Sequence, residues 1–217
     1  MMMVRRAIVF FPIAASVGIL AGCRGKPGDE HDTDARAATS PATSVGKPAA
    51  AAAGVPATVE AIGHHAENAF DMAKLGDWAK ARASTDSLRP AIDALPGPAG
   101  VGGASRDDVV NAFGELQRAV TTRDRMAALR ASNRLTELGA RLSAPFQPQV
   151  PPEVTLLDYY GRELEIWAAA GNRAKLRETA SALRQTWDAV RPRVEARGGA
   201  REAARFNTLV ARVGAAA

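Results

Sequence analysis

The sequence predicts an all-α protein, and three observations support this. From about residue 58 onward, apolar residues recur at helical spacing, and no segment alternates convincingly as a strand would. Three segments of this region share one apolar register when the chain is shifted by 47 and by 95 residues. Breaks of the turn-forming type occur at matching positions of the three segments. We therefore expect three αα-hairpins with a period of 47 to 48 residues and a C-terminal helix, arranged as a helical bundle or short hairpin array.

The N-terminal segment has the composition of a secretory signal peptide. Arg5 and Arg6 precede a run from Ala7 to Leu20 that carries no charge. This run is shorter than the about 20 residues that a helix needs to span a bilayer, which argues against a transmembrane anchor. It ends at Leu20-Ala21-Gly22-Cys23, which contains the only cysteine of the chain.

This four-residue motif resembles the lipobox of bacterial lipoproteins. The resemblance implies that residues 1–22 are removed and that Cys23 becomes the lipidated first residue of the mature chain. Because Arg24, and not aspartate, follows the cysteine, it also implies anchoring at the outer membrane of the cell envelope, facing the periplasm. Loss of Arg5 and Arg6 lowers the formal net charge from +5 to +3. With Cys23 acylated, no thiol remains for a disulfide or a metal site.

Residues 23–57 predict a flexible linker, because alanine, proline, serine and threonine dominate and large apolar side chains are scarce. Residues 58–217 are long enough to bury one sizeable core. The basic residues are interleaved with acids and form no dense block, which excludes a nucleic-acid-binding stripe. We expect the partners to be the membrane, through the lipid anchor, and a protein or peptide in the envelope.

The repeated register assigns a buried face to each helix. The first helices carry apolar or small residues at spacings of four, three and four: Ile62, Ala66, Ala69, Ala73; Val109, Phe113, Leu116, Val120; Leu157, Gly161, Leu164, Ala168. The second helices repeat every seven residues: Ala81, Leu88, Leu95; Ala128, Leu135, Leu142; Leu176, Leu183, Val190. These sets predict the core.

The turns within the hairpins fall at Gly76-Asp77, Arg123-Asp124 and Gly171-Asn172. Glycine suits the left-handed end of a helix, and Asp or Asn accepts the free N–H groups of the next one. Three long helices kinked at these points are the alternative. The turns resemble those of tetratricopeptide-type hairpins, although the longer period departs from that family, and the likeness implies architecture only. Pro96, Pro145 and Pro192 follow the second helices; we expect the helix containing Pro192 to continue to about Arg197.

Histidine and methionine provide one candidate metal site. His65 and Met72 are seven residues apart and therefore share a helix face, and Met126 from another helix would complete a set of soft ligands for copper. Haem is a related alternative, although a c-type attachment motif is absent from the sequence. Packing of a half-buried histidine beside a methionine explains the same pattern, and we expect no cofactor.

Aromatic residues concentrate in the third unit and provide a candidate ligand groove: Tyr159, Tyr160, Trp167 and Trp187. They would hold a peptide or a small apolar ligand if they faced a groove or cavity, and would be core otherwise. The arginines at 184, 191, 193, 197, 201 and 205 would attract acidic partners, including anionic headgroups.

No set of residues in the sequence predicts catalysis. The glutamates at 115, 137, 163, 165 and 178 mostly alternate with arginines at helical spacing, which predicts a solvated face. We therefore expect a non-enzymatic, lipid-anchored binding module, with a metal- or haem-binding bundle as the alternative and a carrier of lipophilic ligands as a third.

Overall fold

The computed structural model describes residues 54–95 and 103–217. The predicted signal peptide, Cys23, most of the linker and Pro96 lie outside these residues. The described residues form seven α-helices and one short 3₁₀ helix: α1 Ala57–Leu75, α2 Trp78–Asp93, α3 Arg106–Thr122, α4 Arg125–Ser143, η1 Ala144–Phe146, α5 Pro152–Ala169, α6 Arg173–Ala196 and α7 Ala200–Ala216. The all-α prediction is confirmed for this part of the chain.

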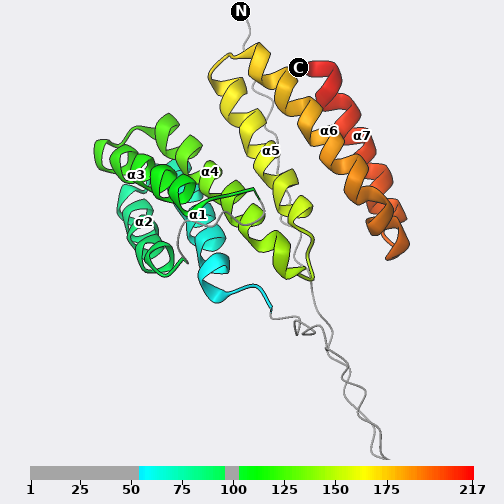
Figure 1. Ribbon diagram of the computed structural model, residues 1–217. Helices are drawn as coiled ribbons and strands as arrows, with labels where there is room; N and C mark the ends of the chain where they lie inside the picture. Colours follow the sequence, from blue (N-terminus) through cyan, green and yellow to red (C-terminus); the bar gives the residue numbers. More distant parts are fainter. Residues whose placement is uncertain (1–53, 96–102) are drawn as a thin grey trace, which may run out of the picture. The chain divides into compact units, whose positions relative to one another are not determined.

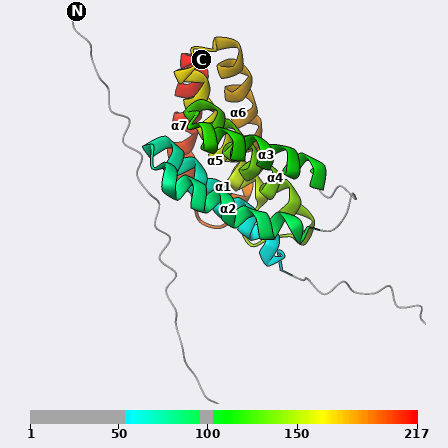
Figure 2. The ribbon, with the colours of Figure 1, turned by 90° about the vertical axis from the view of Figure 1, so that its left-hand side faces the viewer.

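The helices form three hairpins, α1–α2, α3–α4 and α5–α6, followed by α7 (Figure 1). The first two hairpins meet through α1 against α4 and α2 against α3, and the third joins through α5 against α4. Figure 2 is viewed from the side of α2 and α3 and shows these helices in front of α1 and α4. The described residues therefore form hairpins and not three long kinked helices.

The turns within the hairpins have the predicted chemistry. Gly76 and Gly171 adopt positive φ values of 77° and 65° after the first helices of their hairpins. At the next residue, the side chains of Asp77, Asp124 and Asn172 accept the backbone N–H three residues later at 3.0 to 3.1 Å. Each pair satisfies helix-end groups that would otherwise lack partners.

Other helix ends follow similar rules. Ser105 and Asp108 form a reciprocal capping box at the start of α3. Helix α6 passes through Pro192 and ends at Ala196, as expected. Helix α2 also contains an internal proline, Pro90, within its last turn.

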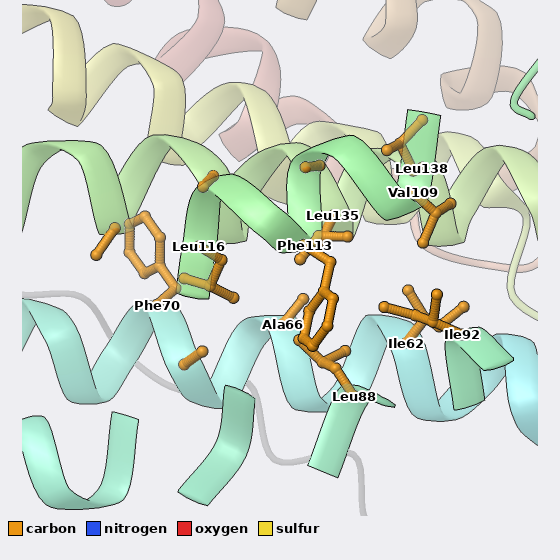
Figure 3. Close-up of a cluster of buried hydrophobic side chains, with 14 of the residues drawn as sticks. Ile62, Ala66, Phe70, Leu88, Ile92, Val109, Phe113, Leu116, Leu135 and Leu138 are labelled. Carbon is orange, nitrogen blue, oxygen red and sulfur yellow. The ribbon is translucent and has the colours of Figure 1, made fainter. Parts of the chain in front are cut away.

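The first core lies among α1 to α4 (Figure 3). Ile62, Leu88, Val109, Leu116 and Leu135 are fully buried in it. Each of these residues belongs to a predicted buried face, and burying a side chain of this size contributes about 1.5–3 kcal/mol. The predicted register is therefore confirmed for the first two hairpins.

A second core lies among α5, α6 and α7. Leu183, Trp187 and Val190 of α6 are buried there against Ala203 and Val210 of α7. Half-buried residues of α5 complete it: Val154, Leu157, Tyr160 and Leu164.

The predicted register is only partly right for α5, where Leu157 and Leu164 pack against the second core. Ala168, expected in the buried row, is exposed, whereas Ile166 is 1% exposed and packs into the first core. The reason is that α5 packs against α4 on one side and against α6 on another. A helix with two packing partners does not have the single apolar stripe that the repeat implies.

Candidate functional site

The predicted lipidation site, Cys23, lies outside the described residues and stays a prediction. Within residues 54–95 and 103–217, no helix is long and apolar enough to cross a membrane.

The three residues of the metal hypothesis are all half-buried, but they lie at different levels of the α1–α4 pair. These helices run antiparallel, because a Cβ added to Gly139 would stand 3.3 Å from the backbone nitrogen of Gly63, while Gly76 lies near the Arg125 side chain. At 1.5 Å per residue, this places Met72 within about 5 Å of the level of Met126 and His65 about 16 Å from it.

The geometry therefore does not support His65, Met72 and Met126 as ligands of one metal ion. Burial, and then the neighbouring charge of His64, lowers the pKa of His65. Among the described residues, no group of three or more His, Cys, Asp or Glu side chains could hold a metal ion.

Three of the four aromatic residues of the third hairpin pack in or against a core, and the fourth, Tyr159, is half-buried. Trp187 is 5% exposed, packs against Phe206 with ring centroids 4.6 Å apart and donates its indole N–H to Asn207 at 2.6 Å. Tyr160 packs against the second core and Trp167 against the first. Burial, followed by the charges of Glu137 and Glu163, strongly raises the pKa of Tyr159.

A polar network between α4 and α5 was missed by the sequence analysis. Asn133 is completely buried and donates to the Tyr159 carbonyl at 3.1 Å and to Glu163 Oε1 at 2.9 Å. The other oxygen of Glu163 accepts from Trp167 Nε1 at 2.6 Å. Asn133 Oδ1 is buried without a hydrogen-bond partner. The network fixes α5 on α4 by side-chain hydrogen bonds as well as by apolar contact.

Glu137 is the second polar residue that the sequence analysis misplaced. It was expected on a solvated face, but it is 5% exposed. Its carboxylate pairs with Arg134, accepts a hydrogen bond from Arg141 Nε at 2.9 Å and forms an ion pair with Arg141 Nη2 at 2.8 Å. Arg141 is therefore held in place by a charged hydrogen bond and an ion pair to a buried acid, a combination stronger than a neutral hydrogen bond.

Arg141 lines a hollow of about 450 Å³ where the end of α4, the following loop, the start of α5 and the end of α6 meet. Its polar wall contains two further arginines from the end of α6, Arg193 and Arg197, and one acid, Glu153. The remaining lining is mainly apolar or amide in character: Ala144, Gln147, Pro148, Gln149, Pro151, Pro152 and Leu156.

The charge in this hollow is only partly neutralised. Arg193 Nη2 donates to Glu153 Oε1 at 3.1 Å, while Glu153 Oε2 is buried without a partner. Arg197 forms no ion pair within residues 54–95 and 103–217. Three guanidinium groups stand against two carboxylates, Glu153 and the Glu137 that pairs with Arg141. The remaining positive charge lies next to apolar surface, which suits an anionic group carried on an apolar or extended chain.

The loop that forms the wall is shaped by its sequence. Pro145, Pro148, Pro151 and Pro152 restrict the backbone between α4 and α5, and Gln147 adopts a positive φ of 48°.

Comparison with known proteins gives no relative: no family model, curated protein or solved structure matches the chain.

Proposed function

We propose that this chain is a lipid-anchored protein of the bacterial envelope whose helical domain binds an acidic peptide segment of a partner and performs no catalysis. The lipobox-like motif at Leu20-Ala21-Gly22-Cys23 supports the anchor. The hollow lined by Arg141, Arg193 and Arg197 carries the binding proposal.

The dimensions and chemistry of the hollow favour a peptide. A volume of about 450 Å³ is within the range of ligand sites and accommodates a few side chains. Leu156 and the loop prolines offer apolar surface to such a segment, while the arginines recognise a carboxylate. Arg141 is already oriented by Glu137, so binding requires little ordering of that side chain.

Fluorescence anisotropy would test the peptide proposal with a labelled pool of short peptides rich in Asp and Glu, beside the same pool with Asn and Gln. We expect the acidic pool to bind and the amide pool to bind at least about tenfold more weakly. Arg193→Gln combined with Arg197→Gln should abolish this difference. Arg82→Gln combined with Arg118→Gln, two exposed arginines outside the hollow, is the matched control. Equal binding of both pools would reject the proposal.

The anchor has a separate test. Intact-mass analysis of the protein from bacterial membranes should show a chain that begins at Cys23 and carries acyl groups. Cys23→Ser should move the protein out of the membrane fraction. An unmodified Cys23 in membrane-bound protein would contradict the anchor and leave the peptide proposal standing.

A further inference from the structure

The positive charge of the chain is concentrated in its last two helices. Residues 173–217 contain ten Lys or Arg and four Asp or Glu, a net charge of +6, whereas residues 1–172 have a formal net charge of −1. The excess therefore belongs to α6 and α7 and to the connection between them.

Helix α7 presents three of these arginines on its outer side. Arg201, Arg205 and Arg212 are exposed and are spaced four and seven residues apart, which places them on one helix face. Ala203 and Val210, on the opposite face, are buried against α6. Within the described residues, only Arg201 of the three forms an ion pair, with the adjacent Glu202 at 3.3 Å. Leu209, which is 50% exposed, lies beside this row of arginines on the helix surface, next to Thr208 in the sequence.

Helix α6 carries a second row of arginines. Arg173, Arg177, Arg184 and Arg191 are spaced four, seven and seven residues apart, so they also share one side of their helix. The Nη2 atom of Arg184 lies 3.4 Å from the position that a Cβ on Gly214 of α7 would occupy. Gly214 lies on the side of α7 that faces α6, so Arg184 reaches the junction of the two helices and not the outer row of α7. We refer to the outer row of Arg201, Arg205 and Arg212 as the basic face.

We infer that the basic face docks against an anionic phospholipid surface. Its charge is spread along about 16 Å of α7, at 1.5 Å per residue, and is not gathered around one pocket. An extended charged surface beside an exposed leucine fits a field of headgroups better than it fits a single acidic side chain. The proposed lipid anchor would hold this face near a membrane, so the inference draws part of its support from the proposed function.

Site-specific fluorescence on the full-length protein tests this inference. A polarity-sensitive dye would be attached at Thr208→Cys on the basic face, or at Ser87→Cys on α2, both exposed positions. The labelled proteins would be reconstituted into phosphatidylcholine vesicles with and without phosphatidylglycerol, at about a third of the lipid. We expect a blue shift at position 208 only with phosphatidylglycerol, and its loss at high salt because salt screens surface charge.

Arginine substitutions provide the decisive comparison. Each arginine near an anionic surface contributes a factor of about five, so replacing Arg201, Arg205 and Arg212 with glutamine should lower the docking equilibrium on the order of 100-fold. Arg82, Arg118 and Arg130, exposed on other helices, form the control triple and should leave the shift unchanged.

Two results would overturn the inference: an equal shift in both kinds of vesicle, or an equal loss in both triple variants. An acidic protein that binds the face while vesicles give no shift would also overturn it. Failure of the proposed lipid anchor can be distinguished from failure of this inference. Without the anchor, the protein would not float with phosphatidylcholine vesicles in a density gradient. These substitutions leave the hollow intact, so peptide binding is assessed independently.

Discussion

Asn133 shows how much one buried polar side chain contributes to the arrangement of helices. Its amide donates to a backbone carbonyl and to a carboxylate of α5, although the residue belongs to α4. Truncation would leave both acceptors without their partner, and an unpaired buried polar group costs about 1–3 kcal/mol. Position 133 therefore determines how well α5, and with it the third hairpin, is held on α4.

Asn133→Asp should destabilise the protein in a pH-dependent way. The new carboxyl would be buried beside Glu163, so both burial and like charge would raise its pKa in the folded state. The pH-dependent part of the destabilisation should therefore be absent below the unfolded pKa of about 4 and should grow as pH rises from there toward the folded pKa. Above the folded pKa it should level off at about 3 kcal/mol or more.

Urea unfolding followed by circular dichroism at several pH values measures this loss. Asn133→Ala is the control, because it introduces no titrating group and its loss should not follow the same pH profile. An equal, pH-independent loss in both variants would contradict the electrostatic argument.

Arg123 occupies a backbone conformation that glycine adopts more easily. Its φ is 56°, and the equivalent turns of the other hairpins have glycine at positive φ. Arg123→Gly should therefore increase the free energy of unfolding by about 0.5–1 kcal/mol, since the left-handed conformation costs about 1 kcal/mol for other residues. Gly76→Ala should have the opposite effect. Chemical denaturation of the two variants checks both signs, and stabilisation by both substitutions would refute the explanation.

At the scale of elements, α1 and α4 approach closely at a pair of glycines. A Cβ on Gly139 would stand 3.3 Å and 3.4 Å from the backbone N and Cα of Gly63, whereas a Cβ on Gly63 would meet no atom within 4 Å. Both positions are helical, so alanine gains helix propensity at each, by up to about 1 kcal/mol. The close backbone contact makes the two sites different.

Gly63→Ala should therefore stabilise the protein by about 0.5–1 kcal/mol. Gly139→Ala should destabilise it by about 1–2 kcal/mol, because the helices must separate to make room for the methyl group. Thermal unfolding of the two variants and the parent protein gives the comparison. If Gly139→Ala instead stabilised the protein, helices α1 and α4 would be able to move apart without loss of stability, which would contradict the argument.

The sequence predicted the features that depend on neighbouring residues along the chain, such as helix caps. It did not predict the features that depend on which helices pack together. Asp77, Asp124 and Asn172 cap their helices as expected, because a cap is formed within a few residues. Nothing local distinguishes Glu137 from a surface glutamate, since its arginine partners have the spacing of an exposed salt bridge. Its burial follows from how other helices pack on α4, which the local sequence does not encode.

At the scale of the molecule, two hydrophobic cores share α5. Ile166 belongs to the first core, while Leu157 and Leu164 pack against the second. A periodic sequence does not reveal this double role, because the repeat assigns one buried face to each helix. The hollow was missed for a related reason: its residues, such as Arg141, Glu153 and Arg193, come together only when the third hairpin is placed.

Trp187→Ala should loosen the second core selectively. The indole is buried and hydrogen-bonded to Asn207, so its removal should cost about 3–5 kcal/mol locally. Hydrogen exchange followed by mass spectrometry should show faster exchange in α6 and α7, with α1 and α4 protected as before. Uniformly faster exchange would instead indicate that the two cores unfold as one unit.

The position of α1 also has a mechanical consequence. This helix begins at Ala57, immediately after the predicted linker, and packs against both α2 and α4. A pulling force applied through the chain before Ala57 would act first on α1, which has packing neighbours on two sides. Such a load must slide α1 out of the first core, whereas a pull at the C-terminus would peel α7 from α6 alone. The domain should therefore resist force applied ahead of α1 better than force applied at the end of α7.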